Sequence, residues 1–161
     1  MVLEEGKNPK IFNLANAASL LWHAYNSLPS PSADVNWAGF YVLDSKPPTS
    51  PSTGKPRQQL ILGPFQGKVA CQTILFGRGV CGTAASERRT QLVPDVEAFP
   101  GHIACDGDSK SEIVIPILKN GSEEEVVAII DIDCAVLNGF DETDQIWLEK
   151  LAVLLGGACD W

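Results

Sequence analysis

Hydrophobic residues recur along this chain with two spacings, which indicate helices near both ends and strands between them. Close to the amino terminus they follow a spacing of three and four residues, at Ile11, Leu14, Ala15, Ala18, Leu21, Trp22 and Tyr25. This spacing predicts an amphipathic helix within residues 8–28, which Pro29 and Pro31 end. A second helix is predicted within residues 140–155, with Asp141 as its N-cap and an apolar stripe through Ile146, Trp147, Leu151 and Leu154.

Runs of apolar, β-branched and aromatic residues predict the strands. These runs lie at residues 35–44, 59–65, 69–76, 111–118 and 126–133. The segment "GRGVCGTAASERR", residues 77–89, joins a glycine turn to a short predicted helix. Residues 111–133 are typical of a hairpin, because two apolar runs flank an Asn-Gly pair. If pairing is centred near residues 121 and 122, Glu112 lies across from Asp131.

Two segments are predicted to be loops. Residues 46–57 are rich in proline and serine, which cannot pack into a core, so we expect a long mobile insertion within a hairpin. Residues 91–110 contain turn residues throughout and little periodicity, so we expect a long irregular loop. The order of helices and strands predicts one α+β domain over residues 1–161. Its terminal helices pack on one face of an antiparallel sheet.

Composition and charge exclude several classes of function. Twenty acidic residues against twelve basic ones give a net charge of -8, and no cluster of lysine and arginine could follow a phosphate backbone. Neither nucleic acid nor a membrane is an expected partner. No secretory leader is recognisable, so we expect a cytoplasmic protein, with the nucleus left open. Five cysteines, an odd number, favour thiols that the cell keeps reduced, and any disulfide should be transient and functional.

Three carboxylates are expected to converge. Asp131 and Asp133 are two residues apart near the end of a predicted strand, so their side chains share one face. The hairpin brings Glu112 to the same end. Mutual repulsion should raise at least one of their pKa values, so that this cluster could donate a proton or hold an ammonium group. The alternative is that these acids only solvate a strand end.

Three cysteines fall in different predicted settings. Cys81 lies at the start of a helix, where the helix dipole favours a thiolate. Cys105 has His102 and Asp106 as neighbours that could tune its ionisation. Cys71 lies in a predicted strand. For any lone cysteine, a small buried hydrophobe is the commoner role, and this is the interpretation we prefer for Cys134 and Cys159.

A zinc site built from cysteine and histidine is not favoured. Structural zinc normally uses at least one close pair such as C-x₂₋₄-C, and no two of Cys71, Cys81 and Cys105 are that close. Adding His102 does not change this spacing. Motifs for nucleotide hydrolysis, dinucleotide redox chemistry and zinc proteolysis are also absent from the sequence. We therefore expect no metal and no bound cofactor.

Several motifs together resemble those of the free methionine-(R)-sulfoxide reductases, small proteins with the GAF fold. The matching segments run in family order from Asn36 to Asp133: "NWAGFYVLD", "LILGPFQGKVACQTI", "GRGVCGTAA", "VPDVEAFPGHIACD", "SEIVIPI" and "IIDID". The sequence departs from the family pattern in the long insertion at residues 46–57 and at Cys134. The resemblance implies a GAF-like sheet with active-site loops on the face opposite the terminal helices.

The resemblance also implies roles for individual residues. Cys105 becomes the nucleophile, Cys71 the resolving cysteine that forms a disulfide with it, and Cys81 a third redox position of unsettled role. The carboxylates of Glu112, Asp131 and Asp133 would hold the ammonium group and the sulfoxide oxygen of the substrate. The side chains of Trp37 and Tyr41 would form the wall around its methyl group.

The activity implied is reduction of free L-methionine (R)-S-oxide to L-methionine. A thiol attacks the sulfoxide sulfur, a sulfenic acid forms, and an intramolecular disulfide follows, which thioredoxin reduces with electrons from NADPH. The alternatives are a non-catalytic GAF module that binds a small ligand and a redox or metal sensor that uses the same cysteines. The apolar N-terminal helix could also pair with a second copy, so a homodimer is a further expectation.

Overall fold

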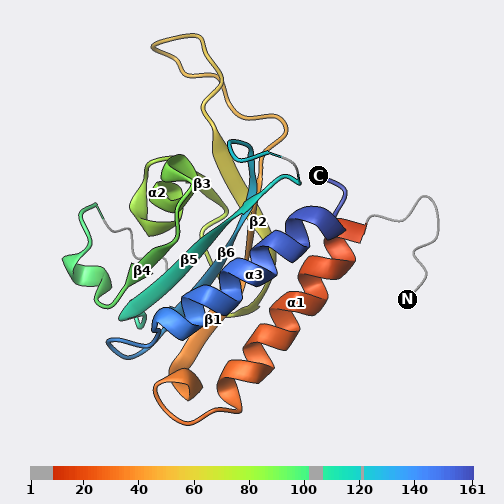
Figure 1. Cartoon of the computed structure of the whole chain (residues 1–161). Coiled ribbons are helices and arrows are strands. Elements are labelled where there is room, and N and C mark those ends of the chain that lie inside the picture. The colour runs from red at the N-terminus through yellow and green to blue at the C-terminus, as the bar shows by residue number, and fades with distance from the viewer. Residues whose placement is uncertain (1–8, 102–106, 121) are drawn as a thin grey trace.

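A six-stranded antiparallel sheet forms the centre of the computed structural model, which describes residues 9–101, 107–120 and 122–161 (Figure 1). The strands are β1 (Val35–Leu43), β2 (Gln59–Gly67), β3 (Thr73–Leu75), β4 (Gln91–Val93), β5 (Ser111–Leu118) and β6 (Val126–Cys134). They lie in the order β3-β2-β1-β6-β5-β4, so β1 and β6 occupy the middle of the sheet and β5 lies beside β6. Strand β6 is buried along nearly its whole length, which explains its almost continuous apolar run.

Helices cover both faces of this sheet. Helix α1 (Pro9–Asn26) and helix α3 (Glu142–Ala158) lie side by side on one face, whereas α2 (Gly79–Glu87) lies on the other (Figure 1). Two short 3₁₀ turns, η1 (Ser32–Asp34) and η2 (Val96–Ala98), complete the described elements. The predicted α+β arrangement, with the terminal helices together on one face, is confirmed.

Helix α3 begins as the sequence predicts. The Asp141 side chain accepts hydrogen bonds from the backbone N–H groups of Thr143 and Asp144, and the Asp144 carboxylate accepts one from the Asp141 N–H. This capping box satisfies N–H groups that have no partner within the helix. The Tyr25 hydroxyl donates to the Asp144 carboxylate at 2.8 Å, which ties the carboxyl-terminal end of α1 to the start of α3.

The predicted apolar stripe of α3 is wrong at three of its four positions, and only Leu151 is partly buried against the core. Ile146, Trp147 and Leu154 are 51%, 64% and 64% exposed. The face that packs against the sheet instead carries Leu148, Ala152, Leu155 and Gly156. Apolar residues surround much of this helix, and its angle to the sheet decides which of them are buried. On α1 the prediction is partly right, because Leu14, Ala18 and Tyr25 are buried but Ile11 and Ala15 are exposed.

Several loop and strand boundaries also differ from the prediction. Residues 91–110 contain an edge strand, β4, which pairs with β5, and the turn η2, so this segment is not wholly irregular. Strand β3 is shorter than the run that predicted it. Within residues 46–57, Thr49 and Pro56 form an isolated bridge and the Ser50 N–H donates to the Lys55 carbonyl. The mobility of this insertion stays a prediction.

The β5–β6 hairpin forms, but with a different register from the one predicted. Glu112 pairs with Asp133, and Asp131 pairs with Val114. Next to the connection Leu118 pairs with Val126, already one residue away from the predicted register, and a bulge between Ile117 and Leu118 adds the second residue. A displacement of two residues leaves every side chain on its predicted face, since side chains alternate with a period of two.

Alternation along the strands divides the interior into two cores. Ile113, Ile115, Ile130 and Ile132 pack beneath α1 and α3, together with Phe40. A second cluster lies between the sheet and α2 and contains Trp37, Tyr41, Val114, Ile129 and the α2 residues Val80, Cys81, Ala84 and Ala85. Among the described residues, no helix has the length and apolar character needed to cross a bilayer.

Candidate active site

A cavity of about 330 Å³ lies against the face of the sheet that α2 covers. Side chains from β1, β5, β6, α2 and the segment between β2 and α2 converge on it. Its lining consists of Trp37, Tyr41, Val69, Ala70, Cys71, Thr73, Ile74, Leu75, Arg78, Gly79, Val80, Cys81, Ser109, Glu112, Asp131 and Asp133. Seven of the eight residues that the sequence singles out therefore surround one space. The eighth, Cys105, and its neighbour His102 lie outside the described residues.

The three acidic residues reach the cavity because of strand alternation. Asp131 and Asp133 alternate on β6 with Ile130 and Ile132, which face the helix-covered core. Glu112 on β5 lies directly across from Asp133. The side chains of Glu112 and Asp131 are 7% and 6% exposed, so two carboxyl groups are buried in contact with the same cavity.

Burial perturbs the ionisation of both buried acids. It is the largest cause that raises the pKa of Glu112 well above its usual value, and the charges of Asp131 and Asp133 raise it further. Burial likewise raises the pKa of Asp131 to about 6, although hydrogen bonds from Cys81 and Glu112 oppose the shift. The sequence predicts this direction but attributes it to mutual repulsion, whereas loss of hydration is the larger cause.

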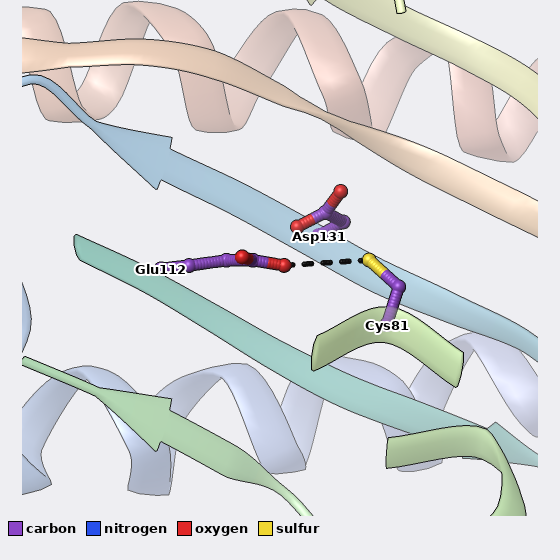
Figure 2. Close-up of side chains that lie close together, drawn as sticks. All are labelled: Cys81, Glu112 and Asp131. Atoms are coloured by element: carbon purple, nitrogen blue, oxygen red, sulfur yellow. Dashed lines mark hydrogen bonds between the residues drawn. The ribbon is translucent and has the colours of Figure 1, made fainter. Parts of the chain in front are cut away.

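Cys81 contradicts the expectation of a thiolate. Its thiol donates a hydrogen bond to Glu112 Oε1 at 3.4 Å, with the Asp131 carboxylate beside the pair (Figure 2). Burial, followed by the charges of Asp131 and Glu112, raises the pKa of the Cys81 thiol well above its ordinary value. The position of this residue near the helix start is as predicted, but burial beside two acids outweighs the helix dipole.

The remaining cysteines fall into two groups. Cys71 lines the cavity and is disulfide-bonded, so it offers no thiolate to a metal. Cys134 and Cys159 are free thiols, as Cys81 is. Cys134 is fully buried in the core beneath the terminal helices, where its thiol donates to the Pro31 carbonyl. It therefore lies on the face of the sheet opposite the cavity.

An aromatic wall bounds another side of the cavity. The Trp37 ring stacks on Tyr41 with centroids 5.8 Å apart, and on Phe65 with centroids 5.2 Å apart. The Trp37 indole N–H donates to the Lys68 carbonyl, which fixes the ring plane. A Cβ at Gly39 would lie 2.3 Å from the Phe65 Cβ, so glycine is required where the two strands approach.

Sequence reasoning missed three other features around the cavity. Arg78, directly before α2, lines it and adds a cation to an otherwise acidic site. Ser109 also lines it, and its hydroxyl accepts a hydrogen bond from the Asn36 side chain. Lys68 pairs with Asp108, which links the end of β2 to the segment before β5. Arg78 could have been found from its place in "GRGVCG", next to Cys81.

Comparisons with known proteins point to one family. The GAF domain family matches residues 30–160. The free methionine-R-sulfoxide reductase of Saccharomyces cerevisiae is 54% identical over 98% of this chain and 79% of its own length. The Escherichia coli protein of the same name is 40% identical over 95% of this chain and 79% of its own length.

Solved structures agree with these relatives. The free methionine-R-sulfoxide reductase of Neisseria meningitidis, in complex with its substrate, has a TM-score of 0.77 and 38% identity, covering 94% of this chain and 78% of that chain. The fRMsr of Staphylococcus aureus, also in complex with substrate, has a TM-score of 0.72 and 41% identity, covering 94% and 85%. The GAF-like fold that the sequence predicts is confirmed.

Proposed function

Since this chain belongs to the GAF domain family and to the free methionine-R-sulfoxide reductases, we propose that it reduces free L-methionine (R)-S-oxide to L-methionine. One observation carries the proposal. Buried carboxyl groups, a stacked aromatic wall and two cysteines line a single cavity large enough for an amino acid. These are the groups needed to bind the substrate, to protonate its oxygen and to accept oxidation.

The carboxylates hold the ammonium group of the substrate. Asp131 Oδ1 is buried and accepts no hydrogen bond from the described residues, so an ammonium N–H would supply a missing donor. Asp133 and Glu112 lie on the same side of the cavity. A pKa of about 6 leaves Asp131 largely ionised at neutral pH, as an ammonium partner must be.

Arg78 pairs with the carboxylate of the substrate. A free amino acid carries both charges, and a peptide-bound methionine carries neither of them at that residue. Among the described lining residues Arg78 is the cation, and it lies at the start of α2, where unpaired N–H groups also favour an anion. The aromatic wall of Trp37 and Tyr41, with Phe65 stacked behind Trp37, then accommodates the methyl end of the side chain.

Glu112 protonates the sulfoxide oxygen. The S–O bond does not break until its oxygen is protonated, and burial, which raises the pKa of Glu112, favours the protonated form that can donate. The Cys105 sulfur supplies an electron pair to the sulfoxide sulfur, and oxygen ends on Cys105. The methionine sulfur is thereby reduced by two electrons, the Cys105 sulfur is oxidised to a sulfenic acid, and methionine leaves.

Cys71 resolves the sulfenic acid. Its thiolate attacks the Cys105 sulfur, an S–S bond forms and water leaves. The disulfide state of Cys71, together with the free state of Cys81, Cys134 and Cys159, supports Cys105 as its partner. The dithiol of thioredoxin then reduces this disulfide and is itself oxidised to a disulfide. NADPH is the final electron source, and no cofactor is bound to the chain. The reducing cytoplasm is the compartment that this cycle requires.

The test is NADPH oxidation coupled through thioredoxin and its reductase, with separated substrates. Free methionine (R)-sulfoxide should be turned over. The (S) diastereomer and a peptide-bound (R)-sulfoxide should be turned over at least about tenfold more slowly, since either change disturbs the ammonium, carboxylate or oxygen contacts. Equal rates on all three substrates would contradict the proposed binding mode, and no turnover of any would contradict the function.

A further inference from the structure

The floor of the cavity carries a donor set that suits a metal ion. Cys81 comes from α2, Glu112 from β5 and Asp131 from β6, and one ligand atom of each lies within 4.8 Å of the others (Figure 2). A tetrahedral zinc ion with a sulfur ligand at about 2.3 Å and an oxygen ligand at about 2.1 Å separates these two atoms by about 3.6 Å. The Cys81 sulfur and Glu112 Oε1 are 3.4 Å apart.

A separate observation points to a cation at this position. The Asp131 side chain is only 6% exposed and lines the cavity, yet its Oδ1 accepts no hydrogen bond from the described residues. Native proteins rarely leave a buried carboxylate oxygen without a partner, because no hydrogen bond then compensates for the free energy of its lost hydration. A bound cation would satisfy this oxygen directly.

We propose that Cys81, Glu112 and Asp131 bind a thiophilic divalent cation of the Zn²⁺ class, and that this cation competes with the ammonium group of the substrate. The sulfur ligand selects Zn²⁺ or Cd²⁺ over Mg²⁺ and Ca²⁺, which prefer oxygen. Three protein ligands leave a fourth position open toward the cavity, where water can bind. Binding releases the Cys81 proton, and any proton held by the two carboxyl groups, to solvent.

The competition half of this proposal rests on the proposed function. Asp131 serves both occupants, so one site cannot hold the ammonium group and the metal together. Only the metal uses the Cys81 sulfur as a ligand. A measurement that follows sulfur coordination therefore distinguishes the metal from any other cation attracted by the acids.

The experiment uses the full-length Cys71→Ser/Cys105→Ser variant, in which Cys81 is the remaining cysteine of the cavity. Cd²⁺ is titrated while the ultraviolet thiolate-to-metal charge-transfer band is recorded. We expect the band to saturate at one equivalent, to disappear when Cys81→Ser is added and to persist when Cys134→Ser is added as the matched control. A band that survives Cys81→Ser, or no band at all, would overturn the proposal.

Two further variants guard against a Cys81→Ser chain that does not fold. Glu112→Gln and Asp131→Asn, each in the same background, retain the thiol but remove one charged ligand. Each should weaken Cd²⁺ binding at least about tenfold, in line with the loss of a metal ligand or its partner. Unchanged Cd²⁺ affinity in both variants would place the metal elsewhere and overturn the proposal.

Competition is measured by calorimetry on the same background variant, without turnover. Saturating Zn²⁺ should lower the affinity for free methionine (R)-sulfoxide at least about tenfold, and a chelator should restore it. If the Zn²⁺-bound protein binds the sulfoxide with unchanged affinity, the proposed competition is wrong. If the chain binds Cd²⁺ through Cys81 but neither binds nor reduces the sulfoxide, the proposed function fails and the metal site stands.

Discussion

The two faces of the central sheet differ in what the same strands bury. On β6, Ile130 and Ile132 enter the core beneath α1 and α3, whereas Asp131 and Asp133 line the cavity beside α2. On β5, Ile113 and Glu112 divide in the same way. The face beneath α1 and α3 gains stability from apolar burial. On the cavity face the buried acids lose hydration, and their hydrogen bonds do not fully compensate for that loss. Such a cost is typical of a functional site.

The largest effect on activity should come from Glu112, the proposed proton donor on the cavity face. Glu112→Gln keeps the shape of the side chain but removes its acidic proton, so kcat should fall about 10²–10⁴-fold, the usual contribution of general acid catalysis. Steady-state kinetics in the thioredoxin-coupled assay measure this loss. Glu125→Gln, an exposed carboxyl outside the cavity lining, is the matched control. A Glu112→Gln enzyme with normal kcat would assign the proton to another group.

The opposite face should respond in stability and not in chemistry. Ile132→Ala creates a hole in the core beneath the terminal helices, and we expect it to lower the free energy of unfolding by about 2–5 kcal/mol. Urea denaturation followed by circular dichroism measures this loss. Below the unfolding transition its kcat should stay within about twofold of the original chain. A large loss of kcat in a folded Ile132→Ala protein would show that the two faces are not separable.

The buried acids should also give stability a characteristic pH dependence. Burial raises the pKa of Asp131 from 3.8 to about 6, so the folded chain holds this proton more tightly than the unfolded chain. Its contribution is fully present below pH 4 and is lost as the pH rises through about 6. The loss amounts to about 3 kcal/mol for the shift of this group.

Asp131→Asn removes this titrating group and also the charge that helps to raise the pKa of Glu112, and both changes act in the same direction on stability. Between pH 4 and pH 7 the variant should lose less stability than the original chain, by an amount approaching that value. The measurement is urea denaturation at a series of pH values. Asp144→Asn would be unsuitable as a control, because Asp144 caps α3 and accepts from Tyr25. Asp108→Asn, on an exposed ion pair, is the better choice. If the free energy of unfolding changes with pH in the same way for the original chain and for Asp131→Asn, the pKa of Asp131 is not raised.

The smallest of these effects concerns the cation at the cavity. Arg78→Met should raise KM for free methionine sulfoxide about tenfold with little change in kcat, because it removes the proposed charge contact to the substrate carboxylate. Arg78→Lys should recover part of the affinity. Arg89→Met, on an exposed arginine that pairs with Glu87 outside this cavity, is the control. An unchanged KM in Arg78→Met would show that Arg78 does not bind the substrate carboxylate and would assign this contact to backbone N–H groups.

Sequence patterns predicted the parts of the fold that depend on local order. Continuous apolar runs identified β5 and β6, and Asp141 marked the start of α3, since both signals act within a few residues. The buried face of α3 could not be predicted, because Ile146 and Trp147 are as apolar as the residues that pack. The hairpin register failed by two residues, one from the position of the turn and one from the bulge, because neither can be placed from composition alone.

The candidate site shows the same division. Strand periodicity correctly predicted that Asp131 and Asp133 share one face. The family motifs assigned Cys71, Trp37 and Tyr41 to the site, and all three line the same cavity. The ionisation of Cys81 could not be predicted, since it depends on burial and on acids that lie 31 and 50 positions further along the chain. Arg78 was overlooked because a single exposed arginine carries no pattern of its own.

The role of Cys105 is tested most directly by methionine release from Cys105→Ser compared with Cys134→Ser. In the proposed mechanism reduction requires the thiol of Cys105, whereas Cys134 lies buried on the face of the sheet opposite the cavity. Amino-acid analysis after incubation with free methionine (R)-sulfoxide, thioredoxin, its reductase and NADPH gives the answer. We predict no methionine from Cys105→Ser and a normal yield from a folded Cys134→Ser. Full methionine release by Cys105→Ser would contradict the account.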